Sequence, residues 1–252
     1  MSFSDGGFHF VDLPNGWTVG RFGAMEELDG VAHVVTTRKA LDVRLVADDR
    51  AAAAATLAKE LGLAGAAFCR QVHGNEVVAV ADSGPAGDAD AMLTAHRGLG
   101  LMALSADCPL ILLADPVSGT VGTAHASWRG TVARIAPNLV LEMVSRFDAS
   151  CANMVACICP SAGPCCYKVG QDVADAAISG IGPHAEGFFL TRGGATYFDL
   201  WRANAAELVQ VGLRRQNVHV AGVCTICRND VFPSYRVEGA SAGRFAAVIG
   251  RT

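Results

Sequence analysis

Basic clusters and long apolar runs are both missing from this sequence of 252 residues. Charged residues make up 17% of it and the net charge is −4, which excludes a strongly basic nucleic-acid surface. The longest apolar tract, Leu99–Ala114, is interrupted by polar residues and proline, and it is too short to span a membrane. The first residues show no basic segment followed by an apolar core, so no signal peptide is expected. We therefore expect a cytoplasmic protein with no nucleic-acid or membrane partner.

Histidine is also scarce, with seven residues and no His-x-His pair. A multicopper centre needs many histidines, usually in such pairs, so the sequence disfavours one. Cysteine is not scarce, because nine are present, an odd number without a secretory signal, which favours reduced thiols over a disulfide framework. Cys224 and Cys227 form a C-x-x-C motif, but with no second pair it is weak evidence for metal or redox chemistry. Adjacent Cys165 and Cys166 would rarely form a disulfide with each other.

Apolar residues make up 51% of the chain, which is therefore globular and long enough to bury a large core. The absence of repeats and linkers favours one mixed α and β domain over residues 1–252. A hairpin is expected at 8–21, a loop at 84–90, and one helix at 131–147 with a kink at Pro137. Further strands are expected at 31–37, 68–73, 77–81, 110–114, 120–124, 154–158, 218–223 and 245–249, and further helices at 48–61, 169–181 and 199–211.

The stretch from Leu104 to Gly130 carries most of the candidate chemistry. Two apolar runs are joined by a turn rich in Asp, Pro and Gly, which indicates a strand-loop-strand unit. Such a unit can bring Cys108 and His125 together, and His73 also lies at the end of an expected strand. Two imidazoles and a thiolate suit a zinc ion with an open position for water or substrate. From spacing alone, the same residues are equally compatible with structural roles.

Several motifs together resemble one family. They read RQVHG, DADAMLT, LSADCPLILLADP, GTAHASWRGT, GPCCYKVG, FDLWRANAAEL, SYR and AGRFAAVIG, and the match runs from about Val31 to the C-terminus. The family is the YfiH-like one, formerly called multicopper polyphenol oxidoreductase, laccase domain or peptidoglycan editing factor, and later purine nucleoside phosphorylase. The resemblance implies an α+β fold, a four-layer α/β/β/α sandwich with mixed sheets of the CNF/YfiH-like type. It also implies a metal triad, which falls on His73, Cys108 and His125.

The activity implied by the resemblance is cleavage of purine nucleosides with phosphate, together with deamination of adenosine. Zinc is the expected cofactor and copper the less favoured one, because a lone site of two His and one Cys suits a redox-silent ion. Asp107, beside the catalytic candidate Cys108, is either a proton shuttle or a carboxylate that orients a ligand. Arg129, placed just before an expected helix, is the candidate anchor for phosphate. The sequence does not predict an oligomeric state.

Substrate contacts are expected from Gln71 and Asn75, which flank His73, and from Arg38. Trp128 is expected either to stack on a purine or to pack in the core. Two departures from the family pattern stand out. The family's TRxGG stretch is Thr37-Arg38-Lys39-Ala40-Leu41 here, which weakens the case for Arg38, and the family's HAGWRG has Ser127 in place of glycine.

Three alternative functions stay open at this stage. Cys108 and His125 are the nucleophile and base that a cysteine hydrolase needs, with a muropeptide amide as a possible target. A copper-dependent oxidoreductase needs the same three ligands and a weak axial ligand such as Met. A structural zinc that ties sheet edges, without turnover, is the non-enzymatic alternative.

Overall fold

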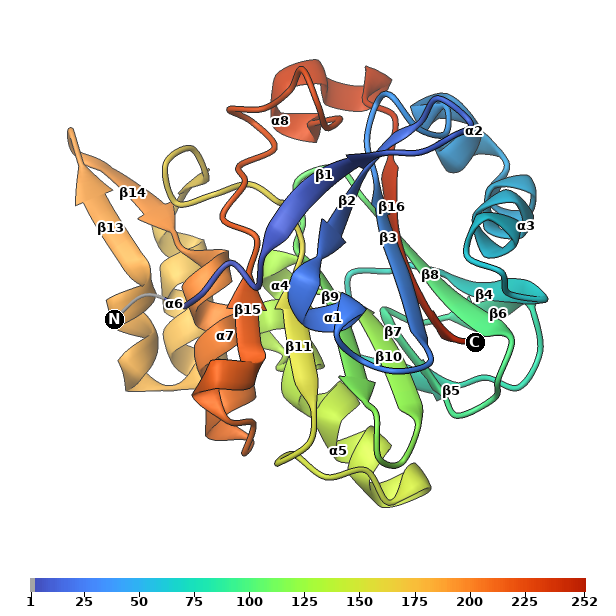
Figure 1. Cartoon of the computed structure of the whole chain (residues 1–252). Helices are drawn as coiled ribbons and strands as arrows, with labels where there is room; N and C mark the ends of the chain where they lie inside the picture. Colours follow the sequence, from blue (N-terminus) through green and yellow to red (C-terminus); the bar gives the residue numbers. More distant parts are fainter. Residues whose placement is uncertain (1–2) are drawn as a thin grey trace.

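The computed structural model describes residues 3–252, and two large sheets run through it (Figure 1). The strands are β1 (Phe8–Asp12), β2 (Thr18–Phe22), β3 (Val31–Thr36), β4 (Gly65–Arg70), β5 (Val77–Ala79), β6 (Gly84–Asp88), β7 (Ala91–Thr94), β8 (Leu99–Ser105), β9 (Leu110–Asp115), β10 (Thr120–His125), β11 (Val155–Ile158), β12 (Lys168–Val169), β13 (Phe189–Arg192), β14 (Ala195–Phe198), β15 (Val218–Val220) and β16 (Phe245–Arg251). The α-helices are α1 (Gly23–Glu26), α2 (Val43–Asp48), α3 (Arg50–Glu60), α4 (Trp128–Val132), α5 (Ile135–Phe147), α6 (Gln171–Ile181), α7 (Leu200–Gln210) and α8 (Tyr235–Glu238). Three short 3-10 helices span Pro183–Phe188, Arg215–Asn217 and Gly239–Ser241.

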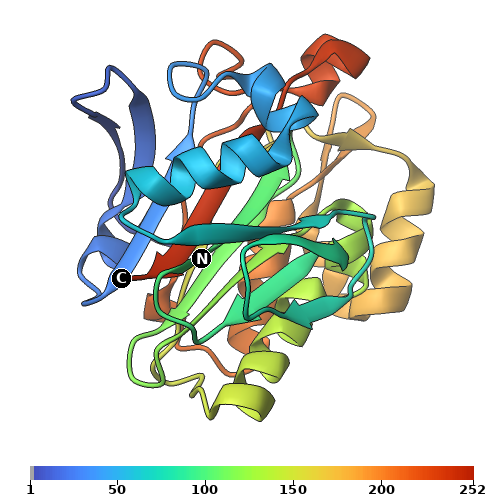
Figure 2. The same ribbon diagram turned by 90° about the vertical axis from the view of Figure 1, so that its right-hand side faces the viewer.

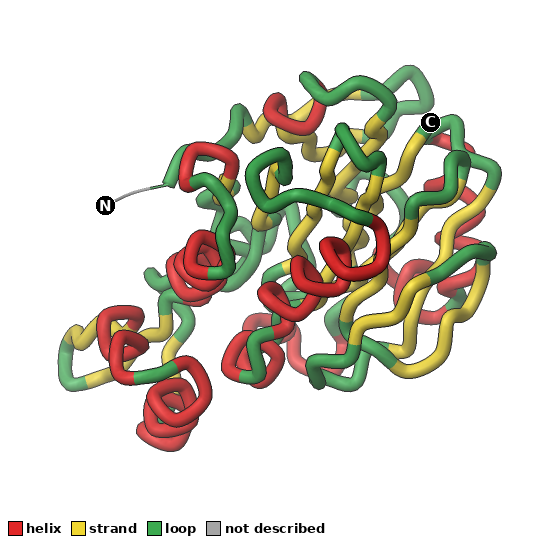
Figure 3. Tube along the Cα trace, turned by 90° about the horizontal axis from the view of Figure 1, so that it is seen from below, coloured by secondary structure: helices red, strands yellow, loops and turns green. Residues whose placement is uncertain are grey.

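Both large sheets are mixed, and a hydrophobic core lies between them. One has the strand order β1-β2-β3-β16-β8-β4-β6 and the other β15-β11-β9-β10-β7-β5. The core between them is built by side chains of both, among them Phe245 and Ile249 from one and Leu110 and Leu112 from the other. A third sheet, β12-β14-β13, lies at one edge of the molecule beside α6 (Figures 1 and 3).

Helices cover the outer face of each large sheet, which gives the four expected layers. Helix α3 packs Leu57 and its alanines onto Met102 and Val248 of the first sheet, and Figure 2 shows it lying across that sheet. Helices α5 and α7 pack Leu139 and Leu208 onto the second sheet. The α/β/β/α arrangement predicted by resemblance is therefore confirmed.

The β9–β10 hairpin shows why its sequence is apolar without interruption. Leu110 and Leu112 face the core between the sheets, whereas Ile111 and Leu113 face α5 and α7. Successive side chains of a strand point to opposite faces, and here both faces are buried. The strand-loop-strand prediction is confirmed, with Leu112 opposite Thr123 in the antiparallel register.

Two local predictions were wrong. The segment 131–147 does not form one helix kinked at Pro137, because it splits at Arg134, which adopts a left-handed conformation with φ 63°. Pro137 lies in the first turn of α5, where its missing N–H costs no hydrogen bond. The segment 84–90 is not a loop throughout, because Gly84–Asp88 forms β6, paired in parallel with β4. Within residues 3–252, no helix has the length and apolar character needed to cross a membrane.

Removing bulk between the sheets is expected to be costly. Leu112 is completely buried in that core, so Leu112→Ala should lower the free energy of unfolding by about 2–5 kcal/mol through lost burial and the cavity it leaves. Urea denaturation followed by circular dichroism measures the change. Val117→Ala, in the exposed turn of the same hairpin, is the control and should change stability little. Equal effects from the two variants would contradict the placement of Leu112.

Candidate metal and substrate site

The β9–β10 hairpin places Cys108 beside His125. His125 ends β10 opposite Leu110, and Cys108 lies two residues before Leu110. The residues that follow each of them are joined by a backbone hydrogen bond, in which the Ala126 N–H donates to the Pro109 carbonyl at 2.8 Å. Asp107, the residue before Cys108, has φ 92°, a conformation that costs a non-glycine residue energy and recurs at functional sites. The hairpin predicted from sequence thus brings two of the three expected ligands together.

His73 arrives from the first sheet, just after β4. It also has a positive φ, 63°, within a tight turn. The backbone N–H groups of Val72, His73 and Gly74 all donate to the carboxylate of Asp90, at 3.1, 3.1 and 2.7 Å. Asp90 therefore stabilises the turn that presents His73.

Asp90 also orients His125. Its Oδ1 accepts a hydrogen bond from His125 Nδ1 at 2.8 Å, and both side chains are buried. Burial alone would raise the pKa of Asp90, but the bonds from His125 and from the backbone keep that pKa below its usual value. With Nδ1 committed to the carboxylate, Nε2 is the nitrogen left to bind a metal. One buried carboxylate thus positions both candidate histidine ligands.

No role was expected for Asp90, although it lies in the DADAMLT motif that contributed to the family resemblance. The available sign of a role for Asp90 was its position, a charged residue directly before the fully buried strand β7. Its partners are 16–18 and 35 residues away, and so no local spacing revealed them.

His73, Cys108 and His125 converge as predicted. One ligand atom from each lies within 4.8 Å of the others, and the two imidazole rings meet edge to face with centroids 5.0 Å apart. His125 is buried, Cys108 is half-buried and His73 is exposed, so the group opens on one side. Two imidazoles and a thiolate match a zinc site with three protein ligands and a free fourth position.

The charges of Cys108 and His125 are coupled. Burial opposes ionisation of the Cys108 thiol, but His125 and His73 lower its pKa to about 6. Burial likewise opposes protonation of His125, but the Cys108 thiolate and Asp90 raise its pKa to about 9. At neutral pH the metal-free site therefore holds a thiolate beside an imidazolium.

This coupling predicts how zinc affinity depends on pH. Between pH values of about 9 and 6, zinc must displace the proton of His125, so affinity should fall about tenfold per pH unit as pH falls. Below about pH 6, Cys108 is protonated too, and the fall should steepen. Competition with a chromophoric chelator, calibrated at each pH, measures the slope. An affinity independent of pH over this range would contradict the thiolate–imidazolium pair.

A pocket of about 630 Å³ opens onto the three ligands. This is the size of a site for a small organic ligand. Two tyrosines line it, Tyr167 and Tyr235. Four arginines also line it: Arg44, Arg50, Arg236 and Arg244. The guanidinium of Arg236 lies 4.7 Å from the centre of the Tyr167 ring. None of these six residues had an expected role, because they come from four separate segments of the chain.

Asp107 and Gln71 also line this pocket. The carboxylate of Asp107 accepts hydrogen bonds from the Thr225 hydroxyl and from the Arg236 backbone N–H, each at 2.7 Å. The amide of Gln71 exchanges two bonds of 2.8 Å with the backbone of Leu104, which ties β4 to β8. Both residues therefore reach the site while holding its walls together.

The other predicted site residues lie outside the described lining of this pocket. Asn75 donates to the carbonyl of Ala133 at 3.0 Å, at the end of α4. Arg38 pairs with Glu238 and donates to the Asn229 carbonyl at 2.8 Å.

Arg129 is in the first turn of α4 and not before a helix, which corrects that prediction. It is exposed, with its guanidinium 4.4 Å from the centre of the Trp128 ring. Trp128 itself is partly buried and packs against the hydrophobic cluster around α6. Of its two expected roles, stacking on a purine or packing in the core, this contact favours packing.

Comparisons with known proteins give one consistent result. Residues 35–252 match the family model described as multi-copper polyphenol oxidoreductase laccase. A purine nucleoside phosphorylase of Deinococcus radiodurans is 39% identical over 212 residues, which cover 83% of this chain and 78% of that protein. The purine nucleoside phosphorylase YlmD of Geobacillus stearothermophilus is 32% identical over 194 residues, covering 73% and 71%. The crystal structure of Bacillus licheniformis hypothetical protein YfiH superposes with a TM-score of 0.85 at 26% identity, covering 98% and 99% of the two chains.

Proposed function

This chain belongs to the YfiH-like family, whose model is described as multi-copper polyphenol oxidoreductase laccase, and on that premise we propose that it is a zinc-dependent purine nucleoside phosphorylase. The names of the relatives support the phosphorylase reaction. The observation that carries the proposal here is the open triad of His73, Cys108 and His125, which lines one pocket together with four arginines. Deamination of adenosine, in which water replaces the 6-amino group, is proposed as a second reaction of the same site.

Zinc is preferred to copper on the chemistry of the donor set. A blue-copper site adds a weak axial ligand, usually Met, to two His and one Cys. Among the described residues that line the pocket there is no methionine. When bound, zinc would supply a Lewis acid and an activated water at near-neutral pH. His73, Cys108 and His125 would hold it, and Asp90 would keep the two imidazoles in place.

In the phosphorylase reaction, the bond between C1′ of ribose and the purine nitrogen breaks, and a bond from C1′ to a phosphate oxygen forms. The leaving purine takes up a proton, and the attacking phosphate gives one up, so the reaction has no net change in protons. The arginines of the pocket would bind and orient the phosphate, since guanidinium groups match phosphate oxygens in geometry and charge. Tyr167 and Tyr235 would offer rings against the purine. Asp107, whose oxygens keep further lone pairs beside its two bonds, is the proposed proton carrier.

The direct test uses purified, zinc-loaded protein with inosine, guanosine or adenosine. With phosphate present, the free base and ribose 1-phosphate should appear in equal amounts, and omission of phosphate should stop their formation. Inosine formed from adenosine without phosphate would report the deaminase reaction. If no nucleoside yields products from protein with full zinc occupancy, the proposed function is wrong.

Two arginine variants locate the phosphate. Arg244 lines the pocket, whereas Arg129 lies outside it, at the start of α4. Arg244→Gln should raise the KM for phosphate by about 10- to 100-fold, the usual loss for a hydrogen bond to a charged group. Arg129→Gln should leave that KM nearly unchanged. The reverse result, from initial rates at varied phosphate, would favour the helix start that the sequence analysis predicted.

One observation favours a second candidate function, a cysteine hydrolase acting on an amide such as that of a muropeptide. Cys108, His125 and Asp90 form a thiolate–imidazolium–carboxylate series, as in enzymes that use a cysteine nucleophile. This alternative requires activity in chelator-treated protein and its loss after alkylation of Cys108 by iodoacetamide. The phosphorylase proposal requires chelator to abolish activity and zinc to restore it.

A further inference from the structure

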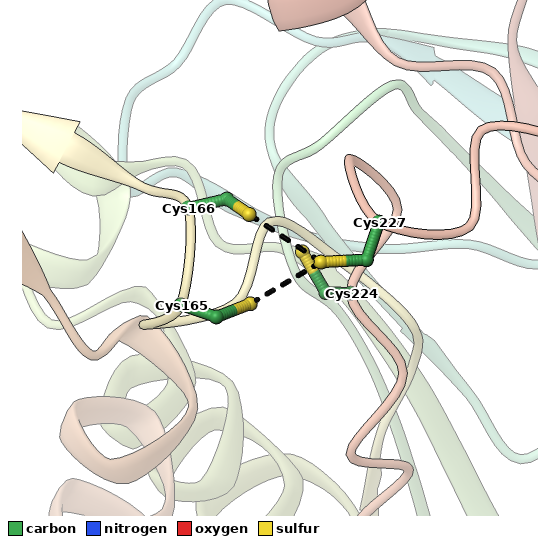
Figure 4. A group of neighbouring side chains, drawn as sticks. All are labelled: Cys165, Cys166, Cys224 and Cys227. Atoms are coloured by element: carbon green, nitrogen blue, oxygen red, sulfur yellow. Dashed lines mark hydrogen bonds between the residues drawn. The ribbon is translucent and has the colours of Figure 1, made fainter.

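Four cysteines outside the catalytic pocket meet in one place. Cys165 and Cys166 come from the loop before β12, and Cys224 and Cys227 from the loop after β15 (Figure 4). All four sulfur atoms lie within 4.8 Å of one another. The Cys227 sulfur is 3.6 Å from that of Cys165 and 3.4 Å from that of Cys166. The tertiary structure thus supplies the second pair that the C-x-x-C motif lacks in the sequence.

These separations fit a single four-coordinate ion. A tetrahedral zinc with Zn–S bonds of about 2.3 Å holds its sulfurs about 3.8 Å apart. A disulfide would need about 2.05 Å between two sulfurs. An iron–sulfur cluster places several metal ions and sulfides between its cysteines, and a group of sulfurs this tight leaves no room for them. Tetrahedral coordination by four thiolates is typical of structural zinc.

The two loops are held in position by contacts that do not involve the sulfurs. Ser161 and Thr225 are joined by a backbone bond of 3.0 Å, and the Tyr167 N–H donates to the Gly163 carbonyl at 2.9 Å. Gly163 allows the close approach, because a Cβ there would lie 2.6 Å from the ring of Trp201 and 3.1 Å from the Cβ of Cys224. The Gly163 N–H also donates to the Cys224 sulfur at 3.3 Å, which favours the thiolate form that binds metal. The sulfurs therefore meet on a backbone that is already organised.

We infer that Cys165, Cys166, Cys224 and Cys227 form a second zinc site, a structural one. Binding exchanges four S–H bonds for four Zn–S bonds and releases four protons, with no change in oxidation state. Cys224 is buried, whereas Cys165 and Cys227 are exposed, which leaves a path for the ion to enter from solvent.

The site would fix one wall of the catalytic pocket. Tyr167 directly follows Cys166 and lines the pocket. Thr225 directly follows Cys224 and donates its hydroxyl to Asp107 at 2.7 Å. Zinc bound to the four thiolates would cross-link these two loops and so hold Tyr167 and Asp107 in register.

The test counts zinc in the full chain, purified under reducing conditions with zinc supplied. Elemental analysis should give two zinc ions in the parent. It should give one zinc ion in the cysteine variant, which combines Cys165→Ser and Cys227→Ser, and one in the histidine variant, which combines His73→Ala and His125→Ala. Cys151→Ser, at a half-buried cysteine that belongs to neither group of ligands, is the control and should retain two. X-ray absorption on the histidine variant should show about four sulfur ligands at about 2.3 Å.

The absorption measurement uses a variant in which all four cysteines are intact, so it does not depend on the folding of the cysteine variant. No zinc in the histidine variant, or a zinc content in the cysteine variant equal to that of the parent, would overturn the inference. A thiol count showing a disulfide between Cys227 and Cys165 or Cys166 in reduced preparations would also overturn it. The phosphorylase proposal is independent of these outcomes, because it depends on the other three ligands.

Discussion

Replacing Cys108 by alanine is expected to reduce phosphorolysis by about a thousandfold or more. The thiolate is one of three ligands in the proposed zinc site, and a Lewis-acid metal contributes several kcal/mol to transition-state stabilisation. The fold should survive, because the Cys108 side chain is only half-buried and its backbone is held by neighbours such as Ser105, whose hydroxyl donates to the Cys108 carbonyl at 2.6 Å. The measurements are initial rates, zinc content and the circular dichroism spectrum.

Two further variants sharpen this result. Cys151→Ala removes a thiol of similar exposure elsewhere and should retain full rate and zinc. Cys108→Asp supplies a carboxylate that can bind zinc but cannot act as a thiol nucleophile. Partial activity and zinc in Cys108→Asp would support the ligand role, whereas zinc without activity would favour the cysteine hydrolase. Normal rates in Cys108→Ala would exclude both roles.

Replacing Asp90 by alanine is expected to lower the free energy of unfolding by about 3–5 kcal/mol, the usual cost of leaving one partner of a buried charged pair alone. The side chain is fully buried and accepts from three backbone amides and from His125. Without it the turn of His73 loses its support and the His125 ring is free to rotate. Zinc affinity should therefore also fall, by about 10- to 100-fold in Asp90→Asn, which keeps the shape of the side chain.

Urea denaturation and zinc competition measure the two effects. Asp88→Ala is the matched control, two residues earlier on the same segment, where the exposed carboxylate pairs with Arg70. Exposed ion pairs contribute little, so this variant should resemble the parent in both measurements. If Asp90→Asn binds zinc as tightly as Asp88→Ala does, Asp90 has no positioning role.

Much of the local structure could be predicted because it depends on residues close in sequence. Asp49 accepts from the Ala52 N–H at 3.0 Å and begins α3, as the run of alanines after an aspartate indicates. The turn of the β9–β10 hairpin lies where Asp115 and Gly119 predict it. The break at Arg134 was missed, because a left-handed arginine leaves no mark in the pattern of apolar residues.

The sequence by itself determined the apolar strands, the hairpin that joins Cys108 to His125, and the family resemblance carried by its motifs. Only the tertiary structure decided that Asp90 supports both histidines, that four arginines share one pocket, and that two separate cysteine pairs meet. The reason is physical: periodicity and turn chemistry act over a few residues, whereas these sites are assembled by strand order and sheet packing, which bring together residues such as Asp107 and Arg236, 129 positions apart. Residue types could be read along the chain, but which of them become neighbours was fixed by the stacking of the two sheets.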